Sequence, residues 1–260
     1  MIETCPRCPS YNSSMFRLPI EIILKALQSG SVSLRSEFAW GSNYTFLVDV
    51  IGNSETAPFS LRAVYKPIRG ETPLWDFPAE SLAHREVAAY LVSEALGWIL
   101  VPPTAYRQEG PLGPGSIQLF INHDPEYHFF NFSLADRKRL RPVVLFDFLV
   151  NNADRKGGHL LLDYDNHIWS IDHGICFHEE DKLRTVLWDF TGKKVPVNLR
   201  TDIRGIYEKL NEPSGLVNDL GAHLTRCEIV ALKTRAAWLC KLIYFPNPPS
   251  DRRPYPWPPL

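Results

Sequence analysis

The sequence has no excess of charge of either sign. Its 260 residues include 28 Lys and Arg against 29 Asp and Glu, which gives a formal net charge of −1. Nucleic-acid binding depends on a strong positive field, so we expect no nucleic-acid partner. Long apolar runs are missing too: a stretch such as VVLFDFLV is far shorter than the roughly 20 residues of a membrane-spanning helix. We therefore expect no insertion into a membrane.

Cysteine is scarce, with five residues in the chain. Cys5 and Cys8 form a CxxC pair, but no second pair completes a tetrahedral zinc site. Free thiols in a reducing compartment are the simpler interpretation. The first residues, MIETCPRCPS, also lack the apolar segment of a secretory signal, so we expect a cytoplasmic protein. A zinc site built from His159, His173 and His178 is a weaker alternative, because separate loops hold these residues and no fourth ligand is evident.

Hydrophobic periodicity divides the chain into a β-rich half and an α-rich half. Strands joined by short turns predict an antiparallel sheet and an α+β fold instead of a βαβ series. The strand-like segments are FAWGSNYTFLVDV, LRAVYKP, PTAYRQEG and GSIQLFI. Helices are expected over residues 19–30, 80–97, 133–150, 198–210 and 222–243, and Pro142 should kink or break the third of these.

These patterns predict three segments: an N-terminal lobe over residues 1–121, a C-terminal lobe over 122–245 and a proline-rich tail over 246–260. The tail, PNPPSDRRPYPWPPL, should be extended and should stay outside the core. It could serve as a ligand for an aromatic groove of a partner protein, although its composition favours disorder. We therefore expect that its deletion leaves stability nearly unchanged.

Two features of the first half are typical of phosphate binding. Gly41, Ser42 and Asn43 form a turn between two strands, where backbone N–H groups can meet phosphate oxygens. Lys66 ends the strand AVYK, and strand alternation places Val64 and Lys66 on one face. Taken alone, the first could be an ordinary turn and the second a solvated lysine.

Glu86 is the expected partner of Lys66. It shares one stripe of the predicted helix with Leu82, Ala89 and Leu96. A carboxylate on an apolar stripe needs a partner, since burial of an unpaired charge is costly. A solvated position at the edge of the helix is the alternative.

The stretch NNADRKGGHLLLDYDNHIWSIDHG places carboxylates at both ends of a short hairpin. Asp154 opens a loop that turns through two glycines, and His159 follows five residues later. Two short strands then lead to Asp172 in the sequence SIDHG. The hairpin should bring Asp172 back beside the loop that carries Asp154. One carboxylate could then face an acceptor and the other a metal ion.

The stretch NNADRKGGH…SIDHG resembles the catalytic and metal-binding loops of phosphatidylinositol 3-/4-kinase-like proteins, in a bacterial branch of that group. GSNYTFLV, AVYKP and HREVAAYL fit the same resemblance, which covers roughly residues 40–175. It implies a two-lobed protein-kinase-like fold with ATP in the cleft. Asp154 would be the catalytic carboxylate, Asp172 the main metal ligand, and Lys66, set by Glu86, the phosphate-binding lysine. Gln118 and Phe120 of SIQLFI would lie near the adenine.

The implied function is that of an ATP-dependent phosphotransferase using Mg²⁺ or Mn²⁺. His159 stands where the family has Asn, so its imidazole would be a second metal ligand, would favour Mn²⁺, and would lose metal below about pH 6. Alternatively, His159 only caps the loop. No basic segment for inositol lipids follows Asp172, apart from Lys193 and Lys194, so the hydroxyl acceptor should be a protein or a small molecule. A nucleotide-binding pseudokinase and an AMP-transferring enzyme are the alternative functions.

Overall fold

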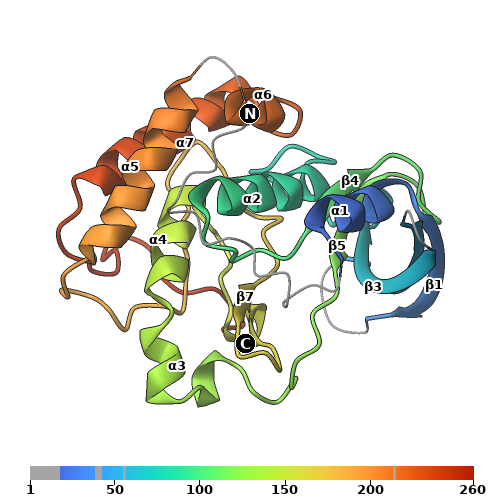
Figure 1. Ribbon diagram of the computed structural model, residues 1–260. Coiled ribbons are helices and arrows are strands. Elements are labelled where there is room, and N and C mark those ends of the chain that lie inside the picture. Colours follow the sequence, from blue (N-terminus) through green and yellow to red (C-terminus); the bar gives the residue numbers. More distant parts are fainter. Residues whose placement is uncertain (1–17, 39–42, 55–56, 213–214) are drawn as a thin grey trace, which may run out of the picture.

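A five-stranded antiparallel sheet forms one side of the molecule, and helices form the other (Figure 1). The computed structural model describes residues 18–38, 43–54, 57–212 and 215–260. The sheet order is β1-β2-β3-β5-β4. Its strands are β1 (Ser31–Glu37), β2 (Phe46–Asn53), β3 (Pro58–Pro67), β4 (Thr104–Arg107) and β5 (Gly115–Leu119). The predicted antiparallel sheet and α+β class are confirmed.

The two faces of the sheet have different neighbours. Ala63 and Tyr65 of β3 are fully buried and pack with Leu27 and other apolar residues of helix α1 (Ile20–Ser29). Val64 and Lys66 alternate with them and therefore point to the opposite face. That face looks toward α2 (Leu82–Leu96), which contacts β4 and β5 on one side and the later helices on the other.

The helical side is built from α3 (Leu134–Lys138), α4 (Arg141–Val150), α5 (Val197–Asn211), α6 (Leu216–Gly221) and α7 (Arg226–Cys240). The predicted helix over residues 133–150 is two helices, because Pro142 in the first turn of α4 cannot continue the preceding one. The short helix α6 was not predicted. None of the helices in the described ranges combines the length and the apolar character needed to cross a bilayer.

Helix α2 is tied to α7 by a buried ion pair. The Arg85 guanidinium donates to the carboxylate of Glu228 and to the backbone carbonyl of Cys176. The side chains of Arg85 and Glu228 are 1% and 9% exposed. Glu228 also completes a capping box with Thr225 at the start of α7, so the partner of Arg85 is itself fixed.

The β6–β7 hairpin lies in the chain between the Asp154 loop and Asp172, and the C-terminal tail lies against the Asp154 loop. The strands are Leu160–Leu162 and Ile168–Ser170, and Figure 1 shows the C-terminus beside β7. The backbone N–H of Thr185 donates to the Pro254 carbonyl at 2.9 Å, and that of Gly157 donates to Pro259 at 2.8 Å. The tail has no helix or strand, as expected, and these hydrogen bonds hold it against the body, in contrast to the disorder that its composition favours.

Candidate active site

An ion-pair cluster joins the sheet, α2 and the segment after β7. The ammonium of Lys66 lies 2.5 Å from Glu86 Oε1 and 2.8 Å from Asp172 Oδ1. The second oxygen of Glu86 accepts a hydrogen bond from the backbone N–H of His173 at 3.0 Å. Glu86 therefore connects the segment after β7 with Lys66, the partner that its place on the buried helix stripe predicted.

The charges in this cluster reinforce one another. Burial opposes the charge of Lys66, but the carboxylates of Asp172 and Glu86 outweigh it and raise the lysine pKa. Desolvation likewise opposes the charge of Asp172, yet the Lys66 ammonium holds the pKa of that carboxyl well below its usual range. Both groups are thus charged at neutral pH. Asp172 has a φ of 59°, a left-handed conformation that non-glycine residues adopt at a cost and that is typical of functional sites.

Asp154 lies in the loop between α4 and β6. The chain leaves α4 through Asn151, whose φ of 55° ends the helix. The Asp154 backbone N–H donates to the side chain of Asn152 at 2.9 Å, which holds the loop in a tight turn. Lys156 places its ammonium 3.4 Å from Asp154 Oδ2. Burial raises the pKa of Asp154 to about 6, and Lys156 opposes this rise.

A buried scaffold beneath the loop was not predicted from the sequence. Arg155 is fully buried, and its guanidinium donates two hydrogen bonds of 3.1 Å and one of 3.0 Å to Asp147 of α4. It also donates to the Ile171 carbonyl at 2.7 Å and contacts His173 Nε2 at 2.7 Å. Arg155 thereby links α4, the Asp154 loop and the residue before Asp172. The sequence did contain one indication of this scaffold. Asp147 lies inside the apolar run VVLFDFLV, and a carboxylate buried there requires a partner.

His159 faces Asp172. Its Nε2 lies 3.2 Å from Asp172 Oδ2, the oxygen that Lys66 does not contact. Its Nδ1 accepts a long hydrogen bond of 3.4 Å from the Lys156 backbone N–H, as the alternative role in capping the loop required. Burial lowers the pKa of His159 to about 4, so the ring is neutral at pH 6. Loss of metal through protonation of His159 is therefore expected at a lower pH than the value near 6 that an unperturbed imidazole predicts.

The pair formed by His159 and Asp172 fits a divalent ion that is shared with a nucleotide. Two donor atoms that bind one small ion at about 2.1 Å each, at a right angle, lie about 3.0 Å apart. The observed 3.2 Å is close to this separation, but a neutral His159 that accepts the Lys156 N–H at Nδ1 carries its proton on Nε2, so binding of an ion there requires the other tautomer, with the proton on Nδ1. Throughout the described ranges, no three His, Cys, Asp or Glu residues are arranged to hold a metal. The zinc alternative is therefore not supported, and a bound ion would need phosphate oxygens to complete its coordination.

Gln118 and Phe120, the residues expected near the adenine, come from β5 and the position directly after it. Gln118 pairs with Val64 in the β3–β5 register, and its side-chain amide donates to Thr104 at 2.8 Å. Phe120 follows β5, and the Arg62 guanidinium lies 4.8 Å from the centre of its ring. Gly41 and Ser42 fall outside the described residues, whereas Asn43 accepts a hydrogen bond from the Thr72 backbone at 2.6 Å.

Comparison with known proteins agrees with this geometry. Residues 47–228 match the family described as phosphatidylinositol 3- and 4-kinase. The chain belongs to this family. As a family member it has the two-lobed, protein-kinase-like fold, and the matched residues contain Lys66, Glu86, Asp154 and Asp172. The family is one of kinase-like phosphotransferases, which agrees with the resemblance found in the loops.

Two kinds of relatives were found by sequence. Protein Rv2133c of Mycobacterium tuberculosis (strain ATCC 25618 / H37Rv) is 38% identical over 267 residues, which cover 89% of this chain and 93% of that protein. Phosphatidylinositol 4-kinase gamma 4 of Oryza sativa subsp. japonica is 27% identical over 64% of this chain. The match spans about a third of the plant protein, 34% of its length. The bacterial relative is thus similar over most of both chains, and the plant kinase over about a third of its own length.

Comparison of structures found two further matches, both at much lower sequence identity. A structure described as hydra Fam20 with sugar superimposes with a TM-score of 0.54 at 14% identity, covering 85% of this chain and 88% of that one. The Helicobacter pylori proinflammatory kinase CtkA gives a TM-score of 0.49 at 12% identity. The first comparison places this family member among kinase-like folds.

Proposed function

We propose that this protein is an ATP-dependent phosphotransferase that acts on the hydroxyl group of a protein or a small molecule. The observation that carries the proposal is the cluster of Lys66, Glu86 and Asp172, with distances of 2.5 and 2.8 Å. Protein-kinase-like catalysis needs the lysine paired with the helix carboxylate and an aspartate in place for metal. The contacts of Lys66 with Glu86 and with Asp172 form one connected group, which supports the proposal. We place the lobe boundary near residue 121, after β5.

Each residue has a role in this proposal. Lys66, and the turn at residues 41–43, would bind the phosphates of ATP, and the face of the sheet with Gln118 and Phe120 would lie near the adenine. Asp172 and His159 would hold Mg²⁺ or Mn²⁺ together with the phosphates. The ion would neutralise charge on the transferred group. Asp154 would orient the acceptor hydroxyl and accept its proton, and its pKa of about 6 suits a base that works near neutrality.

A lipid acceptor is not part of the proposal. In the sequence after Asp172, the candidate for a basic headgroup-binding segment is the small pair Lys193 and Lys194. The ammonium of Lys193 donates to the Asp189 carbonyl at 2.7 Å, and Lys194 is exposed. Recognition of an anionic headgroup at a membrane surface needs several free basic side chains.

Transfer of label from ATP tests the proposed function. The protein would be incubated with a metabolite extract, Mg²⁺ or Mn²⁺, and ATP labelled at either the γ or the α phosphate. Label from the γ position alone should enter a product, and an Asp154→Asn protein should give none. Label from the α position would show AMP transfer instead. ATP binding without any product from either label would mean that the protein is a pseudokinase.

A further inference from the structure

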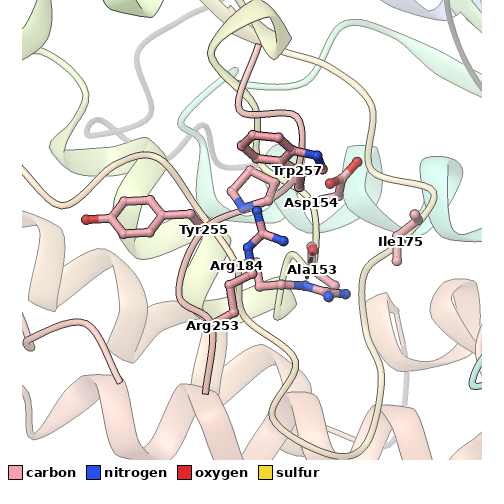
Figure 2. Close-up of a pocket in the computed structure, with 8 residues that line it drawn as sticks. Ala153, Asp154, Ile175, Arg184, Arg253, Tyr255 and Trp257 are labelled. Carbon is pink, nitrogen blue, oxygen red and sulfur yellow. Dashed lines mark hydrogen bonds between the residues drawn. The ribbon is translucent and has the colours of Figure 1, made fainter. Parts of the chain in front are cut away.

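A cavity lies directly beside the Asp154 carboxylate. Its volume is about 260 Å³, and it is bounded by the Asp154 loop, by Arg184 and by the C-terminal tail. Figure 2 shows Asp154 and Trp257 at one end of this group of side chains, next to Arg184 and Arg253. Ligand pockets usually begin near 300 Å³, so this space suits a molecule of about monosaccharide size and not a peptide segment.

The tail forms a fixed wall of the cavity. Its backbone accepts hydrogen bonds from Thr185 and Gly157, on two sides of the Asp154 loop. Arg252 forms an ion pair of 2.6 Å with Asp181, and Pro256 is buried. Along the chain, the contacts of Arg252, Pro254 and Pro259 therefore lie before, between and after the tail residues that line the cavity. The position of Trp257 is therefore set by contacts on both sides of it.

The lining carries more positive than negative charge. Arg184 donates from Nε to the Ala153 carbonyl at 2.8 Å, which fixes its guanidinium against the loop. The Arg253 guanidinium lies 5.2 Å from the centre of the Trp257 ring. In the part of the chain that the structure describes, neither arginine has a carboxylate within ion-pair distance. Two arginines and one aspartate therefore line the cavity, and such a site favours a ligand with an anionic group.

We propose that this cavity is the acceptor site, that the tail completes it, and that the acceptor is a small polyol carrying a phosphate group. The inference rests on the proposed function, since it gives Asp154 the acceptor hydroxyl. Arg184 and Arg253 bind the phosphate of the acceptor, the Trp257 ring packs against its carbon skeleton, and one hydroxyl reaches Asp154. The transferred phosphoryl group passes from ATP to that hydroxyl, ADP leaves, and the hydroxyl proton goes to Asp154.

The same contacts could instead describe an inhibitory strap that excludes a protein substrate. Two observations favour an acceptor site. The tail encloses an open space beside Asp154 instead of filling it, and Trp257 is 74% exposed, so it has surface left for a ligand. A strap that mimics a substrate would place a side chain on the carboxylate, and the residue paired with Asp154 is Lys156 of its own loop.

The experiment measures transfer from γ-labelled ATP to ribose 5-phosphate, glucose 6-phosphate and glycerol 3-phosphate. Ribose, glucose and glycerol are the uncharged controls, and vesicles of phosphatidylinositol in phosphatidylcholine and unphosphorylated casein are further acceptors. The variants are Arg253→Ala and Trp257→Ala, both at exposed positions. Arg226→Ala, an exposed arginine at the start of α7 that does not line the cavity, is the matched control. ATP binding and slow ATP hydrolysis are followed for every protein.

At least one phosphorylated polyol should accept label at a rate tenfold or more above its uncharged counterpart. Arg253→Ala and Trp257→Ala should each lower kcat/KM for that acceptor about tenfold, with ATP affinity and thermal midpoint unchanged, and Arg226→Ala should match the parent. Hydrolysis of ATP with no transfer to any phosphorylated polyol would overturn this inference alone. So would preferred transfer to the vesicles, or transfer to casein that rises when residues 253–260 are removed. Absence of ATP binding would overturn the proposed function itself.

Discussion

Replacement of Asp154 by Asn should stabilise the protein while it removes activity. Burial raises the pKa of this carboxyl to about 6, against about 3.9 in an unfolded chain. A carboxyl whose pKa is raised on folding destabilises the native state wherever it is ionised. Asparagine has nearly the same shape and carries no charge, so the variant escapes this cost.

The size of the effect follows from the pKa difference. About two pKa units correspond to about 3 kcal/mol at most, and the Asp154 side chain is 30% exposed, so solvent screening should reduce the effect to about 1–2 kcal/mol. The difference between the two proteins should be greatest above pH 6, should decrease as the pH falls from 6 to 4, and should vanish below the unfolded pKa. In a protein of this size it amounts to a few degrees in thermal midpoint.

Thermal unfolding of both proteins from pH 4 to pH 8, without metal or nucleotide, measures this difference. Asp165→Asn, at an exposed turn position, is the control and should show no such trend with pH. In the parent, kcat/KM should fall about tenfold from pH 7 to pH 5, because an acid with a pKa near 6 passes from about nine-tenths to about one-tenth ionised. A stability difference that is the same at pH 4 and pH 8 would refute the reasoning.

Three further predictions follow from the other contacts. Lys66→Ala and Asp172→Ala should each reduce the rise in thermal midpoint caused by Mg²⁺ and ATP, because they remove a phosphate-binding cation and a metal ligand; a response equal to that of the parent would contradict the assigned roles. His159→Asn should shift the preference of kcat/KM from Mn²⁺ toward Mg²⁺ and leave the acid-side decline near pH 6 in place, since the His159 pKa is about 4. An unchanged metal preference would leave His159 as a loop cap. Deletion of residues 246–260 should lower the thermal midpoint by about 2–6 °C in calorimetry, because it removes two backbone hydrogen bonds and an ion pair; no change would mean that these contacts contribute nothing.

Local sequence patterns were enough to predict the ion pair between Lys66 and Glu86. Strand alternation placed Lys66 on the face opposite Ala63 and Tyr65, and helical spacing placed Glu86 on a buried stripe. The ion pair at 2.5 Å joins those two predictions. They succeeded because each depends only on the geometry of one element and on the cost of an unpaired buried charge.

Other parts depend on contacts that leave no periodic signal. Arg155 stands in a polar stretch and looks solvated, yet it is fully buried against Asp147. The tail is held mainly by carbonyl oxygens of Pro254 and Pro259, which every residue type possesses, so composition could not reveal the attachment. In both cases the deciding partner comes from a distant segment, and only the folded chain brings the two together.

The buried ion pair at the base of α2 has a consequence for inhibitor design. Arg85 ties the helix to Glu228 of α7 and to Cys176, and the next residue, Glu86, holds Lys66. A compound that binds only after α2 swings outward must also break the Arg85 pair, at about 3–5 kcal/mol. This penalty would weaken such a compound by roughly two to four orders of magnitude. Compounds that bind while α2 keeps the position seen in this structure avoid that penalty.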